Sequence, residues 1–391
     1  MTALVIHSAR KIDAAGEVDG FWFSSVDGVI TAVGEGSGWQ RDAAAAASAG
    51  ATVVDARGAW LAPGFIDLHG HGAGGFAFDD GAYAISKALE VHRAHGTTRS
   101  VISLVANPVA ELCASLAAIA DVVTADPLVL GSHLEGPFLA LERKGAHNPD
   151  FLIDPTPAVV EELIAAARGT LRQITMAVER ENALEALDVF VEAGVRVAVG
   201  HTEASFELAQ HAFDRGARLI THVFNAMPGL GHRAPGPIAA ALEDGRVTVE
   251  LILDGVHVHP AVAKVVFGEA SGRVALITDA MSATGCPDGA YSIGSLAVSV
   301  DDGVARLRGA DGSLGSIAGS TLTLDVALRN AIELVGLAPA EAVAALTHVP
   351  AWALGLEHEL GLLAPGYAAD AVLLDHDWSV RSVWGAGNRL A

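Results

Sequence analysis

From Phe65 onwards the chain alternates between short apolar runs and segments of helical periodicity, and this alternation restricts the possible folds more than any other feature. The apolar runs, eight in number, are Phe65–Leu68, Arg99–Leu104, Leu128–Leu134, Ile174–Val178, Val195–Val199, Leu219–Val223, Val247–Leu253 and Val274–Thr278. Helical patterns lie between them, among others at residues 83–94, 108–124, 158–168, 183–193, 204–215 and 260–270. This order predicts an α/β fold, a (β/α)8 TIM-like barrel.

An open, doubly wound sheet is the alternative arrangement of alternating strands and helices. It is less favoured, because no GxGxxG turn follows an early strand. The glycine-dense stretch from Gly70 to Gly75 is interrupted by His71 and does not open a helix.

Both ends of the chain have a different character from the barrel segment. Residues 1 to about 60 form short strand patterns joined by turns, with a hairpin signal at Asp27-Gly28. The strand patterns Ala368–Leu374 and Val380–Trp384 have no partner near the C-terminus. We therefore expect residues 1–56 and 356–391 to form one small β-sandwich domain and residues 57–355 to form the barrel. Within the latter, Tyr291–Arg308 is expected to be an inserted hairpin.

Charge and cysteine content limit the possible partners and compartment. The 391 residues carry a formal net charge of −22, which argues against nucleic acid or an anionic membrane as a partner. The two cysteines, Cys113 and Cys286, make neither a disulfide framework nor a cysteine zinc site. A reduced, cytoplasmic protein is therefore expected.

Two histidines occupy equivalent places in successive strand–helix units. His201 ends one apolar run and His222 ends the next, so both are expected at the C-terminal mouth of the barrel, where active sites of this fold lie. Either histidine alone is more often a packed or hydrogen-bonded residue. Two in register favour a metal site.

Three further strand ends add imidazole or carboxylate groups to the same rim. His69 and His71 are two residues apart and can share a face, Glu135 follows the third strand, and Asp279 follows the eighth. His133 shares the inward face with Glu135 and could be either a ligand or a supporting residue. Neutral imidazole and carboxylate are the usual ligands of a hydrolytic Zn²⁺, which polarises carbonyls and lowers the pKa of water.

Polar loops at the predicted mouth provide further candidates. His147 lies after the third strand and His257 after the seventh. Arg233, after the sixth strand, is either a solvated surface charge or an anion clamp. Cys286 is either a small packed residue or a free thiol, because no catalytic Cys–His pair is evident.

At this point the motifs resemble a known family. The chain is similar to N-acetylglucosamine-6-phosphate deacetylases of the amidohydrolase superfamily over nearly its whole length. The motifs that carry the resemblance are PGFIDLHGHG at 63–72, HLEGPF at 133–138, KGAHNP at 144–149, GHTEAS at 200–205, THVFNAMPG at 221–229, LDGVHV at 253–258, TDAM at 278–281 and AGSTLTL at 318–324. An HxH pair alone would indicate only the superfamily.

The resemblance implies a role for each candidate. It implies metal ligands at Glu135, His201 and His222, a possible second ion at His69 and His71, and an acid/base at Asp279. It places His147 beside the substrate carbonyl. Sugar-phosphate contacts are implied for His257, Arg233 and the backbone of Asn225 and Ala226, with the arginine coming from the neighbouring subunit of a homodimer. The modified lysine of many superfamily members has no counterpart at residues 177–180.

The expected activity is hydrolysis of N-acetyl-D-glucosamine 6-phosphate to D-glucosamine 6-phosphate and acetate. Zn²⁺ is the expected metal, with Fe²⁺, Mn²⁺ or Co²⁺ as alternatives. One rival is an amidohydrolase for cyclic amides or imides, which would leave His257, Arg233 and the Asn225-Ala226 turn without a task. Another is a non-catalytic, metal-stabilised scaffold, which is disfavoured because Asp279 and every ligand position are filled.

Overall fold

The computed structural model describes residues 3–41 and 52–391, so parts of the segment 1–56 lie outside the described residues. The chain divides into two compact units. One combines the described residues up to Asp67 with His92–Arg99 and Leu324–Ala391, and the other contains Leu68–Val91 and Ser100–Thr323. Among the described helices, none is both long enough and apolar enough to cross a membrane.

An eight-stranded parallel sheet forms the predicted barrel. Its strands follow the order β15-β14-β13-β12-β11-β10-β9-β6. Their bounds are β6 Phe65–Asp67, β9 Thr97–Leu104, β10 Val129–Glu135, β11 Leu171–Met176, β12 Arg196–Val199, β13 Leu219–Ile220, β14 Thr248–Ile252 and β15 Val274–Ile277. At the mouth, the backbone N–H of Asp279 donates to the carbonyl of His69 at 2.8 Å, which joins the end of the last strand to the segment that follows the first. The (β/α)8 prediction is confirmed.

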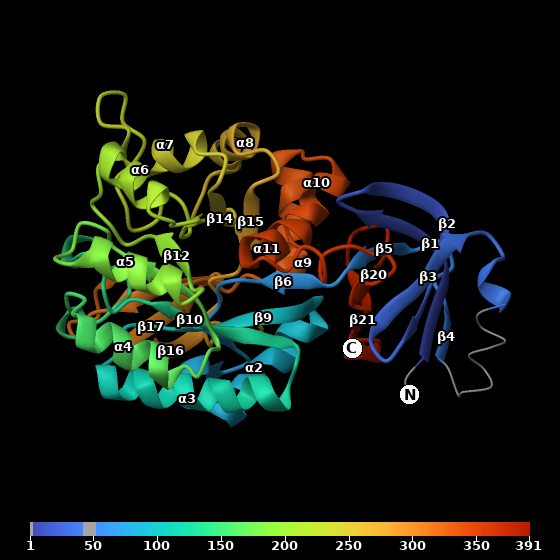
Figure 1. The fold of residues 1–391 in the computed structure, drawn as a ribbon, viewed down its shortest axis with the longest axis horizontal. Coiled ribbons are helices and arrows are strands. Elements are labelled where there is room, and N and C mark those ends of the chain that lie inside the picture. The colour runs from blue at the N-terminus through green and yellow to red at the C-terminus, as the bar shows by residue number, and fades with distance from the viewer. Residues whose placement is uncertain (1–2, 42–51) are drawn as a thin grey trace. The chain divides into compact units, whose positions relative to one another are not determined.

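Helices follow these strands along the chain, and several cover the outside of the sheet (Figure 1). Their bounds are α2 Ala82–Ala94, α3 Val109–Ala125, α4 Pro157–Ala166, α5 Ala183–Glu192, α6 Phe206–Asp214, α7 Gly236–Glu243 and α8 Pro260–Glu269. Local chemistry sets where they begin: Ser205 Oγ accepts the N–H of Leu208 at the start of α6. Buried Ala209 and Phe213 then form the inward face of this helix.

The insertion after β15 is larger than the predicted hairpin. Strands β16 Gly289–Ile293, β17 Leu296–Asp301, β18 Val304–Arg308 and β19 Leu314–Ile317 form an antiparallel sheet with its own apolar core. The sequence pattern predicted only a hairpin over Tyr291–Arg308, a range that overlaps the first three strands. The fourth, Leu-Gly-Ser-Ile, is mostly exposed and has too little alternation to be recognised.

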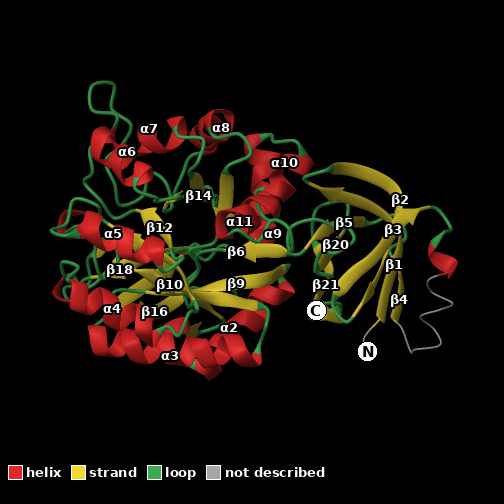
Figure 2. Cartoon of the chain, viewed as in Figure 1, coloured by secondary structure: helices red, strands yellow, loops and turns green. Residues whose placement is uncertain are grey.

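Both chain ends contribute to one further sheet, as expected from the unpaired terminal strands (Figure 2). Its path is β22-β21-β20-β5-β1-β2-β3, with β4 paired to β1. The bounds are β1 Ala3–Asp13, β2 Gly16–Val26, β3 Val29–Glu35, β4 Thr52–Asp55, β5 Trp60–Pro63, β20 Ala371–Leu374, β21 Val380–Gly385 and β22 Asn388–Arg389. Strand β5 belongs to this sheet, and the domain boundaries at residues 56/57 and 355/356 remain a prediction.

Short elements complete the described chain. They are β7 Gly72–Ala73, β8 Phe76–Ala77, the 3-10 helices η1 Phe78–Asp80, η2 Leu141–Arg143 and η3 Pro149–Phe151, the helices α9 Leu324–Asn330, α10 Pro339–Ala344 and α11 His348–Leu354, and the π-helix η4 Ala331–Val335.

Candidate active site

Strand register brings His201 and His222 together. Val199 at the end of β12 pairs with Ile220 at the end of β13, and each histidine follows two residues later. Their Nε2 atoms are 3.0 Å apart. Both residues have positive φ angles, 48° for His201 and 26° for His222, which turn the chain sharply at the strand ends. Such angles are uncommon outside glycine and concentrate at functional sites.

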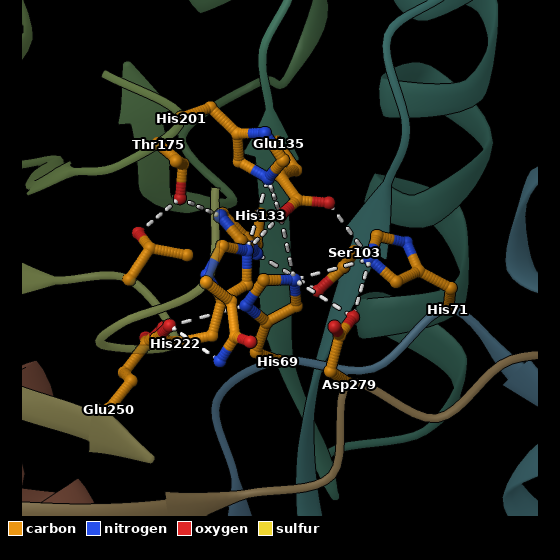
Figure 3. A network of polar contacts seen from close by, with 12 residues as sticks. His69, His71, Ser103, His133, Glu135, Thr175, His201, His222, Glu250 and Asp279 are labelled. Carbon is orange, nitrogen blue, oxygen red and sulfur yellow. Dashed lines mark hydrogen bonds and ion pairs between the residues drawn. The ribbon is translucent and has the colours of Figure 1, made fainter. Parts of the chain in front are cut away.

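The other predicted strand-end residues converge on the same point (Figure 3). His69 and His71 follow β6, Glu135 ends β10, and Asp279 follows β15 with a φ of 47°. Each is at most 8 % exposed. The sequence therefore predicted correctly which strand ends meet, because parallel strands place their carboxyl ends on one rim.

Glu135 lies between two groups of imidazoles. Its Oε1 is 3.1 Å from His201 Nε2 and 3.0 Å from His222 Nε2. Its Oε2 is 3.1 Å from His71 Nε2 and 3.2 Å from His147 Nε2. Oε1 also lies 3.5 Å from His69 Nε2, so this one carboxylate contacts imidazoles of both predicted metal sites.

His69 and His71 form the second half of this cluster with Asp279. Their Nε2 atoms are 3.1 Å apart. Oδ1 of Asp279 lies 3.6 Å from His69 Nε2 and 3.4 Å from His71 Nε2. The ligating atoms of these three residues and Glu135 all lie within 4.8 Å of one another, as do those of Glu135, His147 and His201.

Burial and charge act in opposite directions on these groups. Burial alone would lower the pKa of His69, but the charges of Glu135 and Asp279 raise it well above its usual value. Burial alone would raise the pKa of Glu135, but the neighbouring histidines lower this pKa well below its usual value. Asp279 behaves similarly, its pKa being lowered by His69 and His71 despite burial. Both carboxylates are therefore ionised and attract positive charge to the cluster.

The hydrogen bonds of His201 show that the cluster suits a cation. Its Nδ1 lies 2.7 Å from the carbonyl oxygen of Arg143, which can only accept, so Nδ1 carries the hydrogen. In the neutral ring, Nε2 is then a bare lone pair that faces the carboxylate of Glu135. Atoms bound to one tetrahedral Zn²⁺ lie about 3.3 Å apart, close to the separations seen here. The residues present fit a divalent metal.

His147 has the opposite tautomer. Its Nδ1 accepts the backbone N–H of Ala106 at 3.2 Å, so the neutral ring carries its hydrogen on Nε2. Burial lowers the pKa of His147 to about 4. The ring is therefore neutral at pH 7 and points an N–H donor into the site.

The structure decides between the two interpretations of His133. Nδ1 of this ring lies 2.9 Å from Ser103 Oγ, and Nε2 lies 2.9 Å from Thr175 Oγ1. Both nitrogens are thus held by hydroxyl groups, those of Ser103 and Thr175 (Figure 3). His133 supports the site instead of facing Glu135 as a ligand.

Glu250 is a site residue that the sequence interpretation missed. It is completely buried on β14, with Oε2 3.4 Å from His69 Nδ1 and Oε1 2.7 Å from the amide nitrogen of Gln173. The available signal was an ionisable residue in the middle of the apolar run Val247–Leu253. Buried acids of this kind almost always have a partner.

A cavity of about 340 Å³ opens above the cluster. Its lining residues are His71, Val105, Glu135, Glu142, Arg143, Gly145, Ala146, His147, His201, His222, Asn225, Ala226, His257, Asp279, Ile293, Ser316, Ile317 and Gly319. The predicted contacts His257, Asn225 and Ala226 are among them. The sheet β16–β19 contributes Ile293 and Ile317, a contribution that no sequence motif indicated.

His257 and Arg233 are placed differently. Nδ1 of His257 donates to Asp254 Oδ2 at 2.7 Å, which leaves Nε2 for another partner. Arg233 is exposed and lies between β13 and α7. Among the described residues that line the cavity, Arg233 is absent.

Comparison with known proteins agrees with this architecture. The amidohydrolase family model matches residues 60–390. An N-acetylgalactosamine-6-phosphate deacetylase of Escherichia coli O157:H7 is 36% identical, with 98% of each chain covered. An N-acetylglucosamine-6-phosphate deacetylase of Vibrio furnissii is also 36% identical, with 84% of this chain and 82% of the relative covered.

A solved structure resembles the whole chain. It is a mutant N-acetyl-D-glucosamine-6-phosphate deacetylase from Mycobacterium smegmatis in complex with N-acetyl-D-glucosamine-6-phosphate. Identity is 39%, all of both chains is covered, and the TM-score is 0.91. With a family model that spans most of its length and full-length relatives at this identity, the chain belongs to the amidohydrolase family.

Proposed function

We propose that this protein is a metal-dependent hydrolase that converts N-acetyl-D-glucosamine 6-phosphate into D-glucosamine 6-phosphate and acetate. The observation that carries the proposal is the cluster around Glu135, with Asp279 and His147 beside it in one cavity. The full-length likeness to a deacetylase solved with this amino sugar supports the substrate.

Glu135, His201 and His222 would hold one divalent ion, and His69 and His71 a second, with Glu135 shared between them. Zn²⁺ suits this nitrogen-rich set best, although Fe²⁺, Mn²⁺ and Co²⁺ accept the same ligands. When bound, such an ion polarises a carbonyl and lowers the pKa of water.

Asp279 is the proposed proton carrier. Because its pKa is lowered, the carboxylate is ionised at neutral pH and can accept the proton of the attacking water. The same group then donates that proton to the amine, which is a poor leaving group until it is protonated. One carboxylate therefore suffices for both transfers.

His147 is the proposed hydrogen-bond donor to the substrate carbonyl. Its Nε2–H is fixed by the Ala106 contact and needs no protonation change to act. A donor aimed at the oxygen where negative charge develops stabilises the transition state more than the ground state.

The remaining contacts would hold the sugar phosphate. We assign these to His257, to the backbone of Asn225 and Ala226, and to Arg233 reaching the neighbouring active site of a homodimer in the cytoplasm. Arg233→Ala should raise KM for the phosphorylated sugar by about 10–100-fold with little change in kcat, since a charge-assisted hydrogen bond contributes about 1.5–3 kcal/mol. The unphosphorylated sugar is the control.

N-Acetyl-D-galactosamine 6-phosphate is the second candidate substrate. The Escherichia coli relative named for this sugar covers 98% of the chain, more than the Vibrio furnissii relative does. The two sugars differ only in the configuration at C4.

One panel tests these alternatives. Acetate release is measured with both phosphorylated amino sugars, and ring opening is measured with dihydroorotate and hydantoin. We expect the highest kcat/KM with N-acetyl-D-glucosamine 6-phosphate. A higher kcat/KM with the galactosamine epimer would make that sugar the substrate. Ring opening of dihydroorotate or hydantoin would make the protein a cyclic-amide hydrolase. Inactivity of metal-loaded protein on the whole panel would favour a non-catalytic scaffold.

The second ion is tested separately by elemental analysis. Protein carrying His69→Ala together with His71→Ala should hold one ion fewer than the unmodified protein after identical metal loading. Equal metal content in both proteins would contradict a second site.

A further inference from the structure

We infer that Glu250 is a positioning residue. Its carboxylate fixes the tautomer of His69 so that Nε2, which faces Asp279 and Glu135, is the nitrogen that can bind a cation. In this way Glu250 enables the His69/His71 half of the cluster to hold a cation. The inference rests on the second ion of the proposed function. It assigns a task to the buried acid that the proposed chemistry leaves unused.

Glu250 lies in the barrel interior. It occupies the middle of β14, and its neighbours Val249 and Leu251 pair with β15 in register. Successive strand residues face opposite sides of a sheet, so Glu250 points to the side on which His69 and Gln173 lie. A carboxyl group this deeply buried is costly unless it is hydrogen-bonded.

Gln173 on β11 holds one oxygen of this carboxylate. Its amide nitrogen donates to Glu250 Oε1 at 2.7 Å, and both side chains are fully buried. The amide therefore occupies Oε1, which leaves Oε2 directed at His69 (Figure 3).

The contact with His69 determines which ring nitrogen carries the hydrogen. A carboxylate oxygen accepts hydrogen bonds, so Nδ1, 3.4 Å from Oε2, is the nitrogen that carries the hydrogen. Nε2 is then the nitrogen that can release its hydrogen and bind a cation, and it lies 3.1 Å from His71 Nε2. Carboxylate partners of this kind orient metal-binding histidines and strengthen them as ligands.

The two halves of the cluster are oriented by different groups. His201 donates its Nδ1 hydrogen to a neutral carbonyl, that of Arg143, whereas His69 faces a buried carboxylate. Among the described residues, Nδ1 has no hydrogen-bond partner in either His71 or His222, so His69 and His201 are the oriented histidines of the two halves. The His69/His71 half therefore depends on Glu250 for its orientation, and the His201/His222 half does not.

The test is a Co²⁺ titration of chelator-stripped protein, followed by visible absorption and by elemental analysis. Glu250→Leu should weaken the second Co²⁺ by about 10–100-fold, as expected for loss of such a partner. Affinity for the first Co²⁺ should stay within about threefold. Glu250→Gln retains an acceptor oxygen without the charge and should restore part of the second-site affinity, which a purely structural role would not predict.

Two controls keep the result interpretable. Glu185→Gln changes an exposed acid on α5 and should bind both ions as the unmodified protein does. If Glu250→Leu fails to fold, Glu250→Gln decides the question, because its melting temperature and first-site affinity report an intact barrel.

Three outcomes would overturn the inference: unmodified protein that binds a single Co²⁺, unchanged second-site affinity in both Glu250 variants, or equal weakening of both sites. None of these measurements uses substrate. Failure of deacetylation on the sugar panel would overturn the proposed function and leave the role of Glu250 standing.

Discussion

Buried charges in the terminal sheet and at the barrel mouth are balanced in opposite ways. In the terminal sheet, Lys11 Nζ lies 2.9 Å from Asp13 Oδ2, and the backbone N–H of Leu363 donates to the same oxygen. In the same compact unit, Arg99 on the barrel strand β9 contacts both oxygens of Asp370, at 2.6 and 3.2 Å. Both carboxylates already have a cation beside them, so these two pairs are complete within the protein.

The cluster at the barrel mouth is incomplete by the same measure. Glu135 and Asp279 face imidazole nitrogens, which carry a charge only when protonated, and among the described residues neither carboxylate is paired with a lysine or arginine. Buried charges of one sign are stable only with a counter-charge. The comparison teaches that a buried carboxylate does not by itself mark an active site. A buried carboxylate that lacks a lysine or arginine partner does.

Replacement of the proton carrier should produce the largest effect. Asp279→Asn removes the group that accepts and returns the proton, so kcat should fall by about 10²–10⁴-fold, the usual contribution of general acid–base groups. Metal content and substrate binding should remain. Steady-state kinetics with elemental analysis checks this.

Near-native kcat with full metal occupancy in Asp279→Asn would contradict the proposed mechanism. Glu185→Gln on the surface of α5 is the matched control and should leave kcat unchanged.

Breaking a complete pair should instead affect stability. Asp370→Ala leaves the guanidinium of Arg99, 11 % exposed, without its carboxylate, which should lower the free energy of unfolding by about 3–5 kcal/mol. Denaturant unfolding measures the loss. The double variant Arg99→Met with Asp370→Leu removes both charges and should recover most of it; no recovery would mean that the pair is not what stabilises this region.

Metal removal should have a smaller effect on stability than the loss of Asp370. An ion present at 100 times its dissociation constant stabilises the folded state by about 2.7 kcal/mol, so chelation should lower the melting temperature of unmodified protein accordingly. Glu135→Gln, which weakens the shared ligand, should respond much less to chelation. Equal responses of the two proteins would show that the ion binds elsewhere.

The sequence predicted the barrel well because hydrophobic periodicity is a local signal. Each predicted run overlaps one of the strands β6 and β9–β15, and the strand-end rule placed His201, His222 and Asp279 correctly. It could not predict the fourth strand of the insertion, because Leu314–Ile317 is mostly exposed and lacks the alternation of a half-buried strand.

The supporting residues were harder to predict than the cluster itself. The tautomer of His147 depends on the backbone of Ala106, 41 residues away, and the orientation of His69 depends on Glu250, 181 residues away. Neither contact leaves a spacing pattern in the sequence. Whether His133 was a ligand or a supporting residue depended on where two hydroxyl groups lie, which only the fold reveals.

The pH dependence of a half-exposed pair gives the smallest predicted effect. His95 Nδ1 lies 3.1 Å from Asp325 Oδ1, and this hydrogen bond raises the pKa of His95 above its ordinary value of 6.5, although burial opposes the shift. Because the folded protein binds this proton more tightly than the unfolded chain, the pair contributes its full stability below about pH 6.5 and loses it as pH rises through the folded pKa. The free energy of unfolding should therefore differ more between unmodified protein and His95→Gln at pH 6 than at pH 9.

His376→Gln, at an exposed position of the terminal sheet unit, is the control and should show no such trend. A difference for His95→Gln that is the same at both pH values would mean that its proton does not stabilise the fold, and the contrast between complete pairs and the open cluster would then rest on Arg99 and Lys11 alone.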